Sequence, residues 1–366
     1  MSEQHTERLE ILDLMRLVAA LSVVVYHFTS QPLYLGPAEA DRFTLLQQFT
    51  KFGFLGVELF FLISGFVIFW SASGRTLAAY AASRLSRLLP TLWAAVLLTS
   101  LLLVLTGQSA GIVEPKVLAA NLALVAGPLN LPYVDGVYWT LQYEVKFYAL
   151  AWLVIWASRR VRLENLLALW LLGLASVYAA FAPKGVASLT LFPYGSYFVG
   201  GSLFFVIWRE GMSRLRLVLL TGSLILSLLC LRSETAHFTA GDVSTPTLLI
   251  AATIVIAQYL FFGAVALRMF KLPASEWWIG LGSLTYPLYL IHNVIRRTLT
   301  VYCVPLLGDV MAVVFGIAVS LALAAILART TETQGCRWLR RLLLNVFNSL
   351  KTERLPQPEP SPQTPP

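Results

Sequence analysis

Charged side chains are scarce in this sequence. Only 13% of the residues are Asp, Glu, Lys or Arg, whereas 57% are hydrophobic, and the mean hydropathy is +0.72. Soluble domains usually have about a quarter of their residues charged. The composition therefore excludes an ordinary soluble domain and predicts an integral membrane protein built on helices that are long enough to cross a bilayer.

Cysteines are also few, and the first residues do not resemble a leader peptide. The three cysteines (Cys230, Cys303 and Cys336) show neither metal-ligand spacing nor a disulfide framework, and we expect no metal site. Met1–Glu10 is polar and of mixed charge, and no cleavage site follows it, so we expect the first span to be retained. The net charge of +8 comes from basic residues whose distribution along the chain fits the membrane topology described below. We therefore expect no nucleic-acid partner.

Hydropathy divides the chain into about ten apolar stretches of roughly 17–23 residues, the length that a hydrocarbon core requires. We predict an all-α fold, a polytopic bundle of transmembrane helices. A shorter apolar stretch at Leu118–Leu129 is expected to be interfacial or re-entrant. The expected spans lie near 9–29, 52–70, 88–107, 137–157, 164–181, 190–208, 215–232, 246–267, 278–301 and 308–329.

Lysine and arginine alternate from loop to loop along this pattern. With ten spans and the N-terminus inside, most of the basic residues fall in the inside loops and the tail, and the positive-inside rule then predicts that both termini are cytoplasmic. We divide the chain into a transmembrane domain at 1–330, a basic amphipathic segment at 331–354 on the inner leaflet, and a disordered Pro-rich tail at 355–366.

The first span carries three ionisable residues: Asp13, Arg16 and His27. Such groups cost several kcal/mol or more in a membrane span unless they are paired or face a polar cavity. Arg16 and His27 are eleven positions apart, so they share one helix face at depths that differ by about 16 Å. Asp13 and Arg16 are three positions apart and can alternatively neutralise each other.

Four ionisable side chains from four predicted spans fall in one layer of the membrane. They are His27, Glu58, Glu144 and His292. A carboxylate beside an imidazole fixes its tautomer and raises its basicity, which favours proton transfer. Plainer interpretations remain open: the histidines can be interfacial residues, and Glu58 can pair with Lys51.

Three arginines precede Pro90 on the predicted inner side of the third span: Arg75, Arg84 and Arg87. Arginines at this spacing can bind phosphate groups. The alternative is that they only anchor the span on the positive side of the membrane.

Five motifs occur in the order found in one known family. They are LDLMR with His27 after ten further residues, GVELFFLISGFVI, RLSRLLP, WTLQYEVKFY and LTYPLYLIHN. Together they resemble the acyltransferase-3 family of bacterial membrane O-acyltransferases, from Leu9 to about Ala328. Val145-Lys146 departs from the Glu-Gln that is common in the family. The resemblance implies the short form of the family, without a fused esterase-like domain.

The resemblance implies transfer of an acyl group, usually acetyl from acetyl-CoA, to a hydroxyl of a carbohydrate. The acceptor would be a surface polysaccharide or a lipid-linked glycan, and the enzyme a multi-pass protein of the bacterial inner membrane. The donor is a substrate, and no bound cofactor is expected. The rival hypothesis is a glycan or small-molecule transporter in which His27, Glu58 and Glu144 relay protons.

Residue roles follow from the motifs. His27 is the expected catalytic base, Glu144 orients it or receives the proton, and Arg16 binds the donor or stabilises the oxyanion. The expected ligands of the CoA phosphates are Arg75, Arg84 and Arg87. The expected supporting residues are Asp13, Glu58, Trp139, Tyr289 and His292. Direct transfer and a two-step route through an acyl-histidine both remain open.

Overall fold

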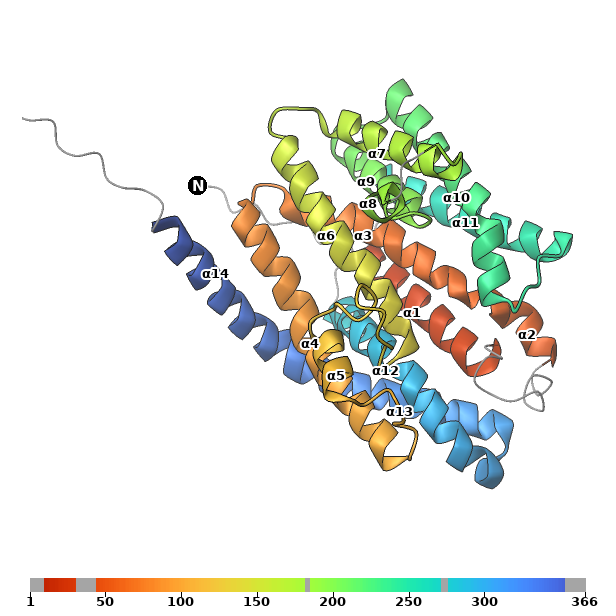
Figure 1. Cartoon of the computed structure of the whole chain (residues 1–366). Coiled ribbons are helices and arrows are strands. Elements are labelled where there is room, and N and C mark those ends of the chain that lie inside the picture. Colours follow the sequence, from red (N-terminus) through yellow and green to blue (C-terminus); the bar gives the residue numbers. More distant parts are fainter. Residues whose placement is uncertain (1–9, 31–43, 182–184, 271–275, 353–366) are drawn as a thin grey trace, which may run out of the picture.

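The computed structural model describes residues 10–30, 44–181, 185–270 and 276–352. Regular structure in these ranges is helical throughout, as the all-α prediction requires (Figure 1). The expected Pro-rich tail lies outside the described residues. In chain order the elements are α1 Glu10–Ser30, α2 Thr44–Thr50, η3 Lys51–Leu55, α3 Gly56–Ala72, α4 Leu77–Leu105, α5 Pro115–Leu122, η4 Gly136–Tyr138, α6 Trp139–Ala157, α7 Leu163–Tyr178, α8 Val186–Thr190, α9 Gly195–Glu210, α10 Arg214–Phe238, α11 Thr245–Ala266, α12 Glu276–Leu307, α13 Asp309–Leu327, η5 Ala328–Gly335 and α14 Cys336–Thr352.

Each of the ten expected spans overlaps one helix. The ten helices are α1, α3, α4, α6, α7, α9, α10, α11, α12 and α13. Within the described ranges, seven helical stretches are long and apolar enough to cross a membrane. The count of ten and the cytoplasmic termini stay predictions. Helix α5 has eight residues and is about 12 Å long, which is too short to cross a bilayer and agrees with a non-spanning segment.

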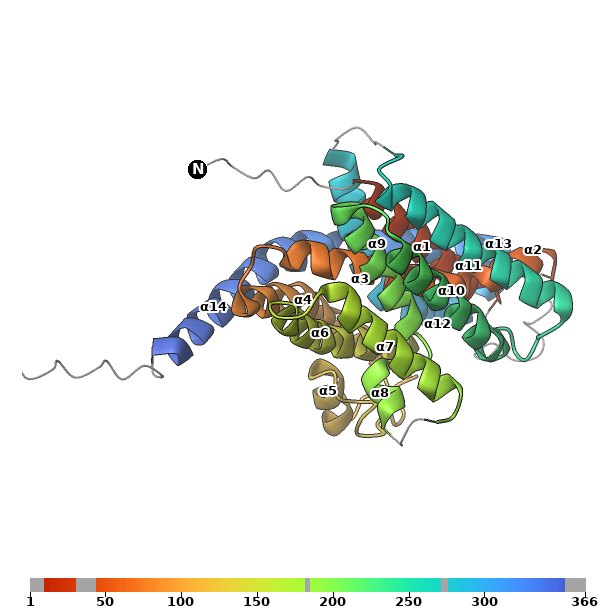
Figure 2. The same cartoon turned by 90° about the horizontal axis from the view of Figure 1, so that it is seen from above.

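The long helices lie roughly side by side, so the bundle has two ends (Figures 1 and 2). We call the end where α1 begins the arginine end, because it holds Arg16, Arg84 and Arg87. The opposite end, where α1 finishes, is the histidine end, and it holds His27.

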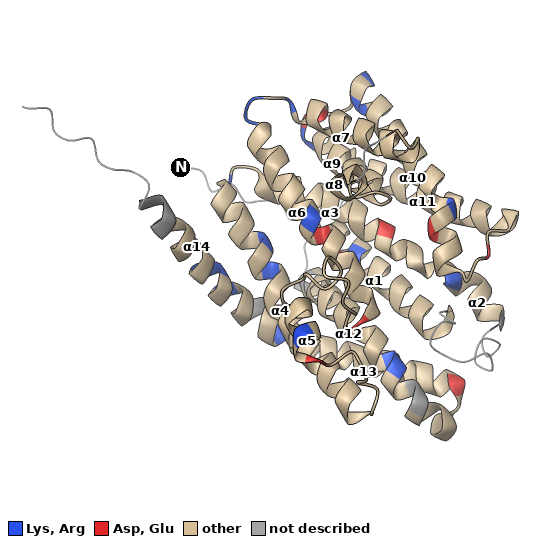
Figure 3. Ribbon diagram, viewed as in Figure 1, with Lys and Arg blue, Asp and Glu red and all other residues tan. Residues whose placement is uncertain are grey.

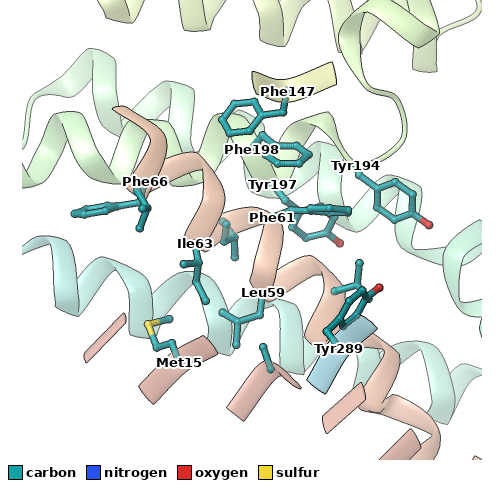
Figure 4. Close-up of a cluster of buried hydrophobic side chains, with 14 of the residues drawn as sticks. Met15, Leu59, Phe61, Ile63, Phe66, Phe147, Tyr194, Tyr197, Phe198 and Tyr289 are labelled. Carbon is teal, nitrogen blue, oxygen red and sulfur yellow. The ribbon is translucent and has the colours of Figure 1, made fainter. Parts of the chain in front are cut away.

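Helix α3 forms the centre of the bundle. Its sequence is apolar on every side, and thirteen of its seventeen residues are buried. It packs closely on α9 because Gly65 and Gly201 face each other's backbones, where any side chain would collide. Figure 4 shows the aromatic rings of Phe61, Phe147 and Phe198 clustered on the α6 and α9 side of α3. The ring centroids of Phe147 and Phe198 are 4.3 Å apart, and their planes are tilted by 31°.

Helix α14 continues from α13 through the π-helical segment Ala328–Gly335. This segment packs on α4 next to Pro90: a side chain at Gly335 would meet Pro90, and the hydroxyl oxygens of Thr91 and Thr331 are 2.8 Å apart. Basic residues mark both α4 and α14 in Figure 3. The position of the 331–354 segment on the inner leaflet stays a prediction.

Candidate functional site

A cavity of about 100 Å³ lies between α1, α3, α4, α6 and α12. We call it the arginine cavity, because three guanidinium groups line it. Val57 and Ile68 also line it, and their separation of eleven residues along α3 makes the cavity about 16 Å long. Its polar lining residues are Arg16, Ser64, Arg84, Arg87, Thr140, Glu144, Tyr148, Thr285, Tyr286 and Tyr289.

The turn between α3 and α4 places two of these arginines. Gly74 adopts a left-handed conformation with φ of 73°, and the Thr76 side chain then caps α4 by accepting a hydrogen bond from the backbone of Ala79. Arg84 and Arg87 consequently lie one turn apart on α4. Arg84 is buried and donates to the Ser71 hydroxyl at 2.9 Å, whereas Arg87 is exposed, so the cavity opens at the arginine end.

The other predicted ligands of the donor divide into two groups. Arg16 lines the cavity and forms an ion pair with Asp13 at 3.0 Å, the neutralising pair that the spacing of three allowed. The Asp13 carboxyl packs against Gly282 of α12, where a side chain would displace it. Arg75 lies exposed in the turn between α3 and α4, outside the lining of the cavity.

Glu144 belongs to the arginine cavity. Its carboxylate accepts a short hydrogen bond from the Tyr148 hydroxyl, and both side chains line the cavity. One turn earlier on α6, the Thr140 hydroxyl lies 2.8 Å from the Tyr289 hydroxyl. The sequence had led us to expect Glu144 beside His27. In the structure, the partners of His27 come from other residues.

His27 of α1 contacts His292 of α12, a residue 265 positions away in the chain. His27 Nδ1 lies 3.2 Å from His292 Nε2 and 2.8 Å from the Val23 carbonyl oxygen. His292 is fully buried, and its Nδ1 lies 2.8 Å from the Tyr289 carbonyl oxygen. We call these two residues the histidine pair.

These contacts define the tautomers of the histidine pair. A carbonyl oxygen can only accept, so His292 Nδ1 must carry a proton, and in the neutral ring Nε2 is then an acceptor. His27 Nδ1 therefore donates, to Val23 and to His292. The remaining nitrogen of a neutral, half-buried His27 is an unprotonated Nε2, the form that a general base needs.

A second polar network supports α12 next to the histidine pair. Asp135, which is buried, accepts hydrogen bonds from the Asn293 side chain at 2.7 Å and from the backbone of Val294 at 3.0 Å. Burial raises the pKa of Asp135 to about 6 despite these bonds. Arg296, also buried, donates to Asn293 and acts electrostatically on both histidines. The sequence analysis selected neither Arg296 nor Asp135 as a site residue.

Tyr289 lies between the arginine cavity and the histidine pair. It lines the cavity, its ring centroid is 5.8 Å from that of His292, and it is also 5.8 Å from the ring of Phe60. The hydroxyl group is tied to Thr140 and to the Val137 carbonyl. One aromatic side chain is therefore in contact with both regions.

Two of the expected supporting residues lie elsewhere. Glu58 is fully buried and faces Glu234 of α10, a residue that the sequence analysis did not select. The Trp139 ring packs with Tyr143, Tyr194 and Phe238.

Lys51, proposed as a partner of Glu58, instead forms an ion pair with Asp242 at 2.7 Å. The hydrogen bond from Lys51, with further ones from Thr247 and Ser244, holds the pKa of Asp242 below its usual range. Metal ligation finds no support in the described ranges, which hold no cluster of three or more potential ligands.

The fold and the two connected regions define a class: a polytopic membrane protein with a basic cavity at one end and a hydrogen-bonded histidine pair beyond it. The acyltransferase domain of the acyltransferase-3 family matches residues 9–329, and the chain belongs to this family of membrane acyltransferases. Neither the curated proteins nor the solved structures contain a significant match to the chain.

Proposed function

We propose that the protein is an O-acyltransferase of the bacterial inner membrane that moves an acyl group, in the first instance acetyl, from acyl-CoA to a carbohydrate hydroxyl. In this proposal the arginine end is cytoplasmic and binds the donor, and the histidine end receives the acceptor. The observation that carries the proposal is the arginine cavity, about 16 Å long, that ends at Tyr289 in contact with the histidine pair.

The positive charge of the arginine cavity determines where the donor binds. Arg84 and Arg87 bind phosphate oxygens of CoA through charge-assisted hydrogen bonds, which are about twice as strong as neutral ones. The pantetheine arm extends along the apolar wall of α3 towards Tyr289. Arg16, paired with Asp13, lies along this path and can polarise the thioester carbonyl.

The acceptor is activated by His27. Its Nε2 takes the proton from the hydroxyl group while the hydroxyl oxygen attacks the thioester carbonyl carbon. The carbon–sulfur bond then breaks, and the thiolate recovers the proton from His27 as free CoA leaves. His292 acts as a positioning residue that holds the His27 tautomer, a role that the sequence had assigned to Glu144. A positioned base of this kind contributes about 10²–10⁴-fold. An acyl-His27 intermediate is compatible with the same geometry.

The test begins with deletion of the gene and proton NMR of purified surface polysaccharides and secreted metabolites. The expected result is loss of an acyl ester resonance that disappears on mild alkali treatment in the parent strain. The wild-type gene should restore this resonance and His27→Ala should not. His237→Ala serves as a control because His237 is an exposed histidine at the end of α10.

Two outcomes contradict the proposal. Restoration of the ester by His27→Ala at wild-type level would remove His27 from the mechanism. Unchanged esters combined with altered glycan export would favour the transporter hypothesis, in which the buried His and Glu residues relay protons.

A further inference from the structure

The boundary between the arginine cavity and the histidine pair is aromatic. Phe60 of α3 and Tyr289 of α12 both line the cavity, and their ring centroids are 5.8 Å apart with the ring planes at 73°. The Tyr289 ring is in turn 5.8 Å from the ring of His292. Neither His27 nor His292 is among the described residues that line the cavity. A donor in the cavity therefore meets the Phe60–Tyr289 ring pair before it reaches the base.

Phe60 lies in the part of the cavity that is nearer to the histidine end. Helix α3 runs antiparallel to α1, because Gly53 packs against the Ser22 carbonyl group and Gly56 packs against the Ala19 carbonyl group. Lower residue numbers on α3 therefore lie nearer to the histidine end. Phe60 is the fifth residue of α3, so it lines the cavity on the side towards the histidine pair.

The two rings differ in how firmly they are held. The Tyr289 hydroxyl oxygen lies 2.8 Å from that of Thr140 and 3.3 Å from the Val137 carbonyl oxygen, and the residue is buried. Phe60 has no polar atom that could anchor it, and it is partly exposed because it faces the cavity. A phenyl ring on a helix has two favoured rotamers, and accessible side chains exchange between rotamers rapidly. Phe60 is therefore the ring that can move.

The chemistry of the base explains why such a ring is useful. An unprotonated His27 Nε2 can take a proton from water as well as from a carbohydrate hydroxyl. The water oxygen would then attack the thioester carbonyl carbon, the carbon–sulfur bond would break, and the thiolate would recover the proton from His27. The products would be acetic acid and free CoA, so the donor would be wasted. Sites that close around their reactants suppress hydrolysis of this kind.

We propose that Phe60 is a specificity-determining gate, whose ring keeps the donor thioester away from His27 until the acceptor is bound and so excludes water as an acceptor. This inference rests on the proposed function and assigns one further residue to it. When the acceptor binds, the Phe60 ring changes rotamer, and the thioester reaches the base beside Tyr289.

The test measures release of labelled acetate from acetyl-CoA by the purified full-length protein in nanodiscs, without any acceptor. Phe60→Ala removes the ring, and Phe60→Tyr keeps it. Phe315→Ala is the matched control, because it removes a phenyl ring at an exposed position on α13. Phe60→Ala is also combined with His27→Ala, and isothermal titration measures the binding of CoA to each protein.

The wild type should hydrolyse acetyl-CoA no faster than His27→Ala, because the base does not meet the thioester. Phe60→Ala should hydrolyse it about 100-fold faster, the lower end of what a positioned base contributes, and His27→Ala should abolish this gain. Phe60→Tyr and Phe315→Ala should behave like the wild type. Hydrolysis by the wild type that depends on His27 would overturn the proposal, even if Phe60→Ala did not fold.

The binding of CoA separates this inference from the proposed function. If CoA does not bind to the wild type, the donor site is wrong and the gate falls with it. If CoA binds to both proteins and Phe60→Ala gains no hydrolysis, the gate is wrong, whereas acyl transfer still depends on the NMR comparison. A gain that persists when His27→Ala is added would mean that the hydrolysis bypasses the base, and this too would overturn the gate.

Discussion

The two ends of the bundle differ in their chemistry. At the arginine end, side chains from α1 and α4 place positive charge around a cavity that is open to water. At the histidine end, the two imidazole rings are aligned by hydrogen bonds to helix carbonyls and to each other. The first arrangement suits recognition of an anion, whereas the second suits transfer of a proton.

Tyr289 connects these two ends, and its place explains why both are needed. A donor held only by its phosphates would leave the reacting carbonyl unpositioned. A base without a bound donor would activate a hydroxyl group that has no thioester to attack. Because Tyr289 touches both the cavity and His292, the proposed mechanism brings the acyl carbon to the base beside this ring. The predictions below separate binding at one end from proton transfer at the other.

The largest effect is expected at the histidine pair. His27→Ala should lower kcat about 10³-fold, because it removes the base, while KM for acetyl-CoA changes little. His292→Ala should lower kcat by about 10²-fold through loss of the His27 tautomer. The measurement is transfer of labelled acetyl from acetyl-CoA in membrane vesicles, with His237→Ala as the exposed-histidine control.

The double variant tests whether the histidine pair acts as one unit. If His292 works only by orienting His27, the double variant should be no slower than His27→Ala alone. Multiplicative losses in the double variant would mean that His292 has a separate role and would contradict the assignment of His292 as a positioning residue.

The next effect is expected at the arginine end. Arg87→Gln should raise KM for acetyl-CoA about 10–100-fold, the worth of one hydrogen bond to a charged group, with little change in kcat. The same substitution should leave transfer from S-acetylpantetheine unchanged, because this donor lacks the phosphates. Arg160→Gln, at an exposed position in the turn between α6 and α7, is the matched control. A fall in kcat for both donors would argue against phosphate binding by Arg87.

The two ends also differ in how much the sequence could predict. Hydropathy predicted the ten helices that overlap the expected spans, because a long apolar stretch can be recognised from its local length and composition. The Asp13–Arg16 pair followed from its spacing of three on one helix, and the structure confirms it at 3.0 Å. Local patterns thus carried most of the fold and part of the arginine end.

Contacts between distant helices could not be predicted in this way. His27 and His292 were both selected, but their contact depends on how α1 packs on α12, which no local pattern contains. The same limit explains why Glu144 was expected beside His27 and why Glu234 of α10 was not selected as the partner of Glu58.

Substitution of Glu144 is expected to have a smaller effect, and it tests whether Glu144 acts at the arginine end or at the histidine end. If it acts at the donor side through Tyr148, Glu144→Gln should cost about tenfold in kcat/KM, because a neutral hydrogen bond replaces a stronger, charge-assisted one. If it orients His27, the loss should equal that of His292→Ala and should not multiply with His27→Ala. Steady-state kinetics of the single and double variants distinguish these two roles of Glu144.

The smallest effect is expected at the histidine end, in the Lys51–Asp242 ion pair. Because Lys51 and its neighbours lower the pKa of Asp242 from the ordinary 3.8, folding favours the ionised carboxylate. Its contribution, at most about 1 kcal/mol for a partly exposed pair, is therefore present above about pH 4 and is lost as the pH falls below that value. Asp242→Asn should lower Tm slightly at pH 7, and the difference from wild type should shrink as the pH falls from 4 to 3. Thermal unfolding in detergent between pH 3 and pH 7 measures this, with Glu114→Gln breaking another exposed pair as the control. A Tm difference that persists unchanged at pH 3 would mean that the substitution acts through packing instead of charge.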